Sequence, residues 1–253
     1  MSKNNSILSL LSLLLFFSMT MFFSMTVMAN VVINGTRIVL NEKDRESTVQ
    51  LRNKGKTPYL LQLWIDDGKM NARPGEIKVP FIITPPVVRV DPGKGQAVRI
   101  VATNPALPKD RESLFWFNML EIPPKAQIQN SGNTHMQLAF RTRIKMFYRP
   151  TGLQTTPLQS YKELKFSLQG NKIKVVNESA YHITFSKIEI RKSKDSPVLA
   201  LVEHFPKRMV EPKSEITFPL LNKKPATLTG NSVFYSVIND YGGETVNEQK
   251  LSF

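Results

Sequence analysis

The chain has 253 residues, a formal net charge of +14 at pH 7 and no cysteine. The length allows one large domain or two ordinary ones, and the lack of cysteine excludes disulfide bonds and thiolate metal sites. The net positive charge is compatible with binding to nucleic acid, an anionic surface or an acidic partner, although most lysines of any protein simply face solvent. The 17 prolines, regular turn signals and short valine-rich runs favour an all-β fold.

Residues 1–29 are predicted to be a secretory signal peptide. Lys3 precedes a long apolar run, and Val27 and Ala29 occupy the small-residue positions before a cleavage site, so we expect cleavage after Ala29. An uncleaved membrane anchor is the alternative, because the run approaches the length that spans a bilayer. Serine and threonine interruptions favour cleavage, and no later segment is apolar enough for membrane insertion. Export also argues against nucleic acid as a partner.

Short apolar runs separated by turn signals then predict two β domains, at residues 30–151 and 158–253, joined by a short polar linker at residues 152–157. In the first domain we expect strands at residues 31–40, 47–53, 59–66, 82–84, 87–90, 96–103, 113–122 and 136–149. In the second we expect strands at residues 164–169, 172–177, 182–191, 215–219, 232–239 and 248–253. Many short strands at this spacing are typical of β-sandwiches.

The segment MQLAFRTRIKMFYRP, residues 136–150, alternates for longer than an ordinary strand. Its even positions, beginning with Met136, Leu138 and Phe140, are mainly apolar, and they share one face of a strand. Strands in globular domains usually run about 3–10 residues, so we expect one half of this strand to pack in its own domain and the other half to meet a partner. By pattern alone, packing of all these side chains in the protein's own core remains the more common outcome.

Three segments of the first domain carry a resemblance to a known family: TPPVVRVDPGKGQAVRI (84–100), LPKDRESLFWFNMLEIPP (107–124) and RIKMFYRP (143–150). In the second domain the match thins to INDYGG (238–243). These segments resemble the periplasmic chaperones of bacterial pilus assembly, the PapD-like family. The resemblance implies an all-β fold of two immunoglobulin-like β-sandwich domains arranged at an angle, with an interdomain cleft. It also implies donor-strand complementation of pilus or fimbrial subunits and their delivery to an outer-membrane usher.

A subunit that lacks one strand of its sandwich exposes an apolar groove and an unpaired edge, and both promote aggregation. The resemblance implies that the chaperone strand covers both, with three apolar side chains inserted into the groove: Met136, Leu138 and Phe140. Each large apolar side chain buried in this way is worth roughly 1.5–3 kcal/mol. The sequence leaves open whether the free protein forms a self-capping dimer that hides these three residues.

Two further sets of residues are charged. The resemblance implies that Arg37 and Lys145 bind the C-terminal carboxylate of the subunit, which a guanidinium and an ammonium can do through charge-assisted hydrogen bonds. It further implies a set of interdomain ion pairs that fixes the domain angle, formed by Glu112, Arg149 and Asp240. Taken without the family, each of these residues fits an ordinary solvated surface charge.

Other functions lack a supporting pattern. A secreted immunoglobulin-like structural or adhesive module of a surface fibre is the main alternative, and it would need neither a carboxylate anchor nor an unusually long apolar strand. A secreted hydrolase would need a catalytic constellation that the sequence does not show. The three histidines are not spaced as paired metal ligands, so the expectation is a non-enzymatic periplasmic chaperone without metal or cofactor.

Overall fold

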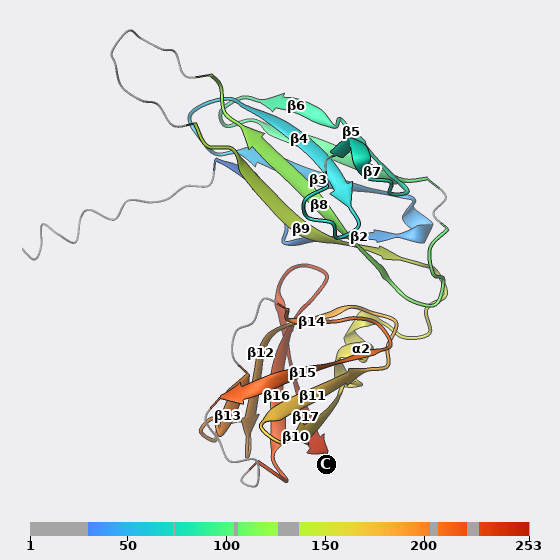
Figure 1. Ribbon diagram of the computed structural model, residues 1–253, viewed down its shortest axis with the longest axis vertical. Helices are drawn as coiled ribbons and strands as arrows, with labels where there is room; N and C mark the ends of the chain where they lie inside the picture. The colour runs from blue at the N-terminus through green and yellow to red at the C-terminus, as the bar shows by residue number, and fades with distance from the viewer. Residues whose placement is uncertain are drawn as a thin grey trace, which may run out of the picture.

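The computed structural model describes residues 30–72, 74–103, 106–125, 137–202, 207–221 and 228–252. These residues form two β domains that meet at an angle (Figure 1), and each domain has its own hydrophobic core. The prediction of an all-β chain with two sandwich domains is confirmed. The predicted signal peptide, residues 1–29, lies outside the described residues. Within the described ranges, no helix is long and apolar enough to cross a membrane.

The N-terminal domain is a sandwich of two sheets. One sheet has the strand order β1 (Val31–Ile33), β3 (Glu46–Asn53), β7 (Gly95–Ala102) and β5 (Phe81–Thr84). The other has the order β2 (Arg37–Asn41), β9 (Phe140–Arg149), β8 (Ser113–Ile122), β4 (Tyr59–Asp66) and β6 (Val87–Val90). Short 3-10 helices lie at Glu42–Asp44 and Pro74–Glu76. Alternation along β4 buries Leu61, Leu63 and Ile65, as expected for a strand with one face on a core.

The single strand predicted at residues 31–40 is wrong, because the chain changes sheets halfway. β1 pairs with β3, and β2 then crosses to run parallel to β9, with Arg37 opposite Lys145 and Asn41 opposite Arg149. The break falls at Gly35, whose backbone φ of +130° is rarely adopted by residues other than glycine. As a result β2 lies beside only the C-terminal half of β9.

The predicted strand 136–149 is shorter in the structure, where β9 has 10 residues and begins at Phe140. The first pair of the β8–β9 ladder joins Glu121 to Phe140, and β8 ends at Ile122, so earlier residues have no strand to pair with. The even positions differ between the two halves of the segment: Met146 and Tyr148 are buried in the core, whereas Leu138 and Phe140 are 57% and 55% exposed. Met136 lies outside the described residues.

The C-terminal domain wraps its strands around an aromatic core in which the Phe166 and Tyr235 rings lie 4.8 Å apart. β10 and β17 pair in parallel, and β13 pairs with both β15 and β12, so the strands form one continuous sheet. Its strands are β10 (Lys165–Gln169), β11 (Lys172–Asn177), β12 (Ile183–Arg191), β13 (Ala200–Val202), β14 (Met209–Val210), β15 (Ser214–Leu221), β16 (Ser232–Ile238) and β17 (Glu244–Ser252). The short strands β13 and β14 were not predicted.

A helix that was not predicted, α2 (Pro157–Lys162), begins where the linker was expected to end. Thr156 is its N-cap, and the side chains of Thr156 and Gln159 form a capping box around the first turn. Proline at the first helical position is also favourable. The carbonyl of Tyr161 accepts a hydrogen bond from the Tyr235 hydroxyl at 2.6 Å, which ties α2 to the core of the C-terminal domain.

Candidate functional site

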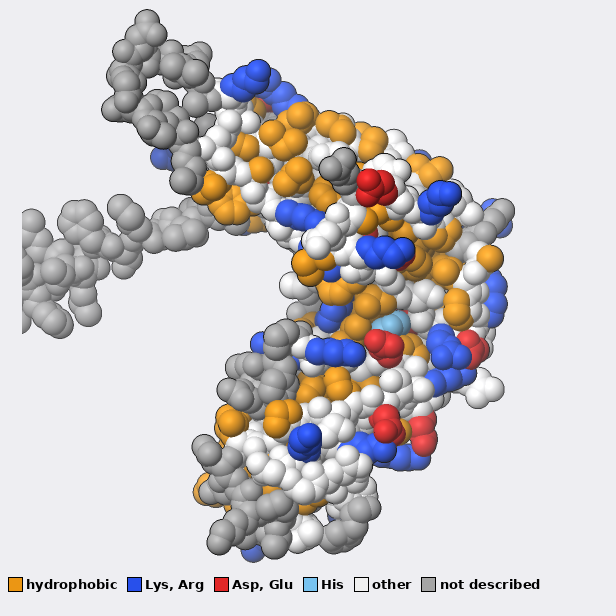
Figure 2. Space-filling model, viewed as in Figure 1, with side chains coloured by type: hydrophobic (Ala, Val, Ile, Leu, Met, Phe, Trp, Pro, Cys, Tyr) orange, Lys and Arg blue, Asp and Glu red, His pale blue; other side chains and the backbone are white. Residues whose placement is uncertain are grey.

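Arg37 and Lys145 lie side by side because β2 and β9 pair in parallel with these two residues in register. Both side chains reach the C-terminal domain. Arg37 Nη1 donates to the carbonyl of Ile238 at 2.7 Å, and Lys145 Nζ donates to Thr184 Oγ1 at 3.2 Å. Figure 2 shows that the molecule is hollowed between the two domains, with basic and apolar side chains around the hollow. The two cations therefore belong to the junction between the domains.

The electrostatics of this pair favour an anion. Burial, together with the nearby charge of Arg37, lowers the pKa of Lys145 to about 8. Burial also lowers the pKa of Arg37, and the charges of Asp240 and Glu112 offset this only in part. Among the described residues, no carboxylate lies within ion-pair distance of Arg37. In addition, Arg37 Nε is buried without a hydrogen-bond partner. Buried donors are usually satisfied, so two desolvated cations with an unused donor form a site that a carboxylate would complete.

The residues predicted to form interdomain ion pairs do meet in the structure. Arg149, at the end of β9, lies 2.7 Å from Glu112 Oε1 through Nη2 and 2.7 Å from Asp240 Oδ2 through Nη1. Glu112 Oε2 also accepts a hydrogen bond from the backbone N–H of His182 at 2.8 Å. Burial would lower the pKa of Arg149, but its bonds to Asp240 and Glu112 outweigh burial and raise it. Their role in fixing the domain angle stays a prediction.

The β16–β17 hairpin that carries Asp240 approaches the N-terminal domain very closely. A Cβ atom on Gly242 would lie 2.6 Å from Thr36 Oγ1, and Gly242 has a φ of +83°. Both observations favour glycine at this position, because any side chain would strain the backbone and displace Thr36. The segment INDYGG carries part of the family resemblance, but Gly242, Thr36, Thr184 and His182 show no local sign of a role at the junction, because only the meeting of the two domains brings them there.

We expect the Asp240→Ala variant to be less stable than the wild type by about 1–3 kcal/mol, because it leaves the mostly buried Arg149 with one carboxylate instead of two. Thermal unfolding measures the loss, and small-angle X-ray scattering measures any change in the angle between the domains. The matched control is Asp91→Ala, which removes a carboxylate from an exposed pair with Arg89. Unchanged unfolding and scattering in Asp240→Ala would show that the ion pairs do not hold the domains.

One edge of β9 is open over half of its length. β8 pairs with β9 from Phe140 to Tyr148, but β2 pairs only with residues from Lys145 onward. Among the described residues, the outer edge of residues 140–144 therefore has no strand beside it. Leu138 and Phe140 are exposed at the start of this edge. An open edge with exposed apolar side chains is the structure that strand addition requires, and Met136, the third predicted insertion residue, lies outside the described residues.

Comparison with known proteins matches both domains to one protein family. The family model described as pili and flagellar-assembly chaperone, PapD N-terminal domain, matches residues 30–154, and the model for the PapD C-terminal domain matches residues 159–249. The probable fimbrial chaperone YadV of Escherichia coli strain K12 is 38% identical over 231 residues, which cover 88% of this chain and 91% of YadV. The chaperone protein MrkB of Klebsiella pneumoniae is 39% identical over 219 residues, with 85% of this chain and 88% of MrkB covered.

Among solved structures, the CupB2 chaperone of Pseudomonas aeruginosa has a TM-score of 0.72 at 35% sequence identity, with 87% of this chain and 100% of the CupB2 chain covered. The family models cover most of the chain, and the relatives match over both domains. The fold, with two sandwich domains at an angle and a hollow between them, agrees with this assignment. The chain therefore belongs to the PapD-like family of pilus-assembly chaperones.

Proposed function

We propose that this protein is a periplasmic chaperone that binds pilus or fimbrial subunits by donating strand β9 and delivers them to an outer-membrane usher. One observation carries the proposal. The open edge of β9, with Leu138 and Phe140 exposed, leads directly to Lys145 on the same strand and to its neighbour Arg37 on β2. Such a strand supplies backbone hydrogen bonds, apolar side chains and a charged anchor to the same partner.

The order of these features along β9 sets the direction of the bound segment. A carboxylate at Arg37 and Lys145 places the C-terminus of the subunit there, and the preceding subunit residues then lie along the open edge toward Phe140. The distance from Lys145 back to Phe140 is about 17 Å of extended strand. The bound segment therefore runs parallel to β9, and the anchor fixes the register that decides which β9 side chains face the groove.

The proposal includes export. Residues 1–29 direct the chain across the inner membrane and are removed after Ala29, and the mature protein acts in the periplasm. Support comes from the apolar N-terminal segment and from membership of a family of fimbrial chaperones.

Co-expression of the full chain with an affinity-tagged pilus subunit tests the function. We expect a one-to-one complex in the periplasmic fraction, with the chaperone beginning at Asn30, and degradation or aggregation of the subunit expressed alone. The control subunit is one already complemented by a strand fused to its own chain, because it presents no open groove. Equal recovery of the open subunit with and without the chaperone would refute the proposal.

Binding of a carboxylate at Lys145 should depend on pH. The pKa of Lys145 in the free protein is about 8, and an adjacent carboxylate raises it, so the subunit binds the protonated lysine and binding takes up a proton above pH 8. We therefore expect the Kd to rise about tenfold between pH 7 and pH 9 in a fluorescence titration. Tyr161, which lies near Arg37, has a pKa raised to about 12 by burial and stays protonated throughout.

The Lys145→Arg variant is the control for this pH dependence, because a guanidinium keeps its charge over the whole range. Its Kd should stay nearly constant between pH 7 and pH 9. A wild-type protein with the same flat profile would show that Lys145 does not bind the carboxylate.

A further inference from the structure

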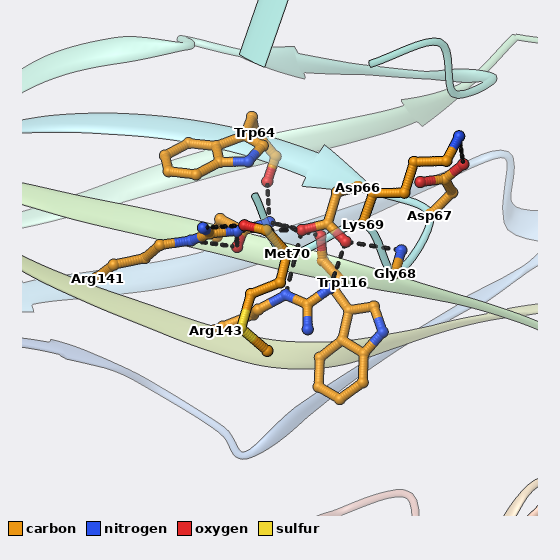
Figure 3. A network of polar contacts seen from close by, with 10 residues as sticks. Trp64, Asp66, Asp67, Gly68, Lys69, Met70, Trp116, Arg141 and Arg143 are labelled. Atoms are coloured by element: carbon orange, nitrogen blue, oxygen red, sulfur yellow. Dashed lines mark hydrogen bonds and ion pairs between the residues drawn. The ribbon is translucent and has the colours of Figure 1, made fainter. Parts of the chain in front are cut away.

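Asp66 is a fully buried carboxylate on the outer face of the five-stranded sheet. Its neighbours on β4, Leu63 and Ile65, point into the core, so alternation directs Asp66 to the opposite face. Side chains on that face usually meet solvent. Figure 3 shows what covers Asp66 instead: two arginines from β9, together with the residues that follow β4.

Several donors converge on the Asp66 carboxylate. Asp66 Oδ2 accepts hydrogen bonds from Asn118 Nδ2 at 2.8 Å and from Arg143 Nε at 3.2 Å. Asp66 Oδ1 accepts one from the Gly68 N–H at 2.8 Å and another from Arg143 Nη2. Burial alone would raise the pKa of Asp66, but the hydrogen bonds from Arg143, Asn118 and Gly68 outweigh burial and lower it. The carboxylate is therefore charged, and it attracts both arginines.

Arg141 is held by more groups than Asp66 alone. Its Nη2 lies 2.7 Å from Asn118 Oδ1 and 3.3 Å from Asp66 Oδ2, and its Nη1 donates to the carbonyl of Met70 at 2.6 Å. The guanidinium carbon also lies 4.9 Å from the centre of the Trp64 ring. These contacts reach three separate parts of the chain, namely β4, β8 and the loop after β4.

Arg143, two residues further along β9, is held in a similar way. Its guanidinium carbon lies 4.1 Å from the centre of the Trp116 ring, a favourable cation–π distance. We call this set of side chains the Asp66 cluster: Trp64, Asp66, Trp116, Asn118, Arg141 and Arg143. In the cluster, four side chains of β4 and β8 hold two arginines of β9 (Figure 3).

The position of these arginines along β9 indicates what the cluster does. Arg141 and Arg143 alternate with Phe140 and Thr142 in the half of β9 that has β8 on one side and no strand on the other. The C-terminal half of β9 is held between two strands, whereas this half has one strand and the cluster. The arginines point to one face of β9, so Phe140 is directed to the other.

We propose that the Asp66 cluster is a positioning device that keeps the open half of β9 extended in the free protein. The inference rests on the proposed function, because the extended half is the part that a subunit would meet. A backbone segment that is disordered before binding must be ordered on binding, which weakens affinity. A strand that the cluster already holds extended presents its edge and its apolar side chains without that loss.

The variant Arg141→Gln tests this inference, with Arg141→Lys as the variant that keeps the charge but not the forked contacts. The matched control is Arg99→Gln on β7, whose arginine forms an exposed pair with Glu46 on the other sheet. In the free proteins, we expect the β8-bonded amide protons of residues 140–144 to exchange at least about tenfold faster in both Arg141 variants than in the wild type and the control. Unchanged exchange, or a rise that extends equally to β3, would overturn the inference.

Binding to a pilus subunit supplies the second measurement. We expect both Arg141 variants to associate roughly 3–10 times more slowly than the wild type, because fewer molecules present an extended edge at any moment. Normal binding by Arg141→Lys would overturn the inference, since it would show that the arginine acts through its charge on the subunit. In a Phe140→Ala background the effect of Arg141→Gln should shrink, because the cluster acts through the side chains it directs.

These measurements separate the two proposals. If the wild type binds no subunit, the proposed function fails, while hydrogen exchange in the free protein still decides whether the cluster orders β9. If the wild type binds and the Arg141 variants match Arg99→Gln in both measurements, the positioning role fails and the proposed function stands.

Discussion

Replacing Lys145 by alanine will weaken binding of a pilus subunit by about 30-fold or more. Removal of one partner from a buried, hydrogen-bonded charge pair costs about 2–5 kcal/mol, and 2 kcal/mol corresponds to about 30-fold in Kd. Lys145 supplies one of the two cations at the junction of the domains, and Arg37 alone cannot replace its ammonium. Isothermal titration or co-purification with a tagged subunit measures the loss.

The same variant should keep its fold and lose no stability. The pKa of Lys145 is about 8 in the folded protein against an ordinary value of 10.5, so at neutral pH the folded state binds this proton less tightly than the unfolded state does. The charged lysine therefore opposes folding at pH 7, and the opposition fades as the pH rises through 8 toward 10.5. Alanine removes this opposition, and its melting temperature at pH 7 should equal or exceed that of the wild type.

The matched control is Lys172→Ala, which removes an exposed lysine from β11 of the C-terminal domain. It should leave both the Kd and the melting temperature unchanged. A Lys145→Ala variant that binds like this control would remove the anchor from the proposed site. A variant that both melts earlier and binds worse would mean that Lys145 supports the fold rather than the partner.

Strands that show a clear pattern within their own segment of the sequence were predicted well. Residues 59–66 and 113–122 are dense runs of apolar and aromatic residues, and β4 and β8 have the predicted bounds. Gly35 and the capping box at Thr156 are also local signals, but the apolar residues on both sides of Gly35 favour one continuous strand, and the polar residues 152–157 favour a linker. The two-residue strand β14 has too few residues to show any period.

The site itself depends on pairing between distant residues, which local patterns do not contain. Arg37 and Lys145 become neighbours through the parallel register of β2 and β9, and only the family resemblance connected them beforehand. The burial of Asp66 is still harder to predict from the sequence, because Asp-Asp-Gly indicates a turn with solvated carboxylates. Its burial results from two arginines that lie about 75 positions later in the chain, and no local rule relates these residues.

Replacing Phe140 by aspartate will weaken subunit binding by at least about 100-fold. Loss of a buried phenylalanine costs roughly 1.5–3 kcal/mol, and a carboxylate placed in an apolar groove adds an unpaired buried charge, so the total exceeds 3 kcal/mol. Phe140 is 55% exposed in the free protein, and the substitution should therefore change the melting temperature by little. Titration with a subunit, beside thermal unfolding of the free variant, separates the two effects.

Two controls show whether position along β9, rather than any exposed apolar residue, decides the result. Ile82 on β5 is also 55% exposed, and Ile82→Asp places the same charge on the other sheet, so it should leave the Kd unchanged. Ala139→Asp moves the charge by one residue, which turns it to the opposite face of an extended chain. If the groove receives alternate side chains, Ala139→Asp binds within a few-fold of the wild type while Phe140→Asp does not. Equal losses in the two variants would mean that this segment meets the subunit without inserting alternate side chains, and strand donation would have to be abandoned in favour of a different contact.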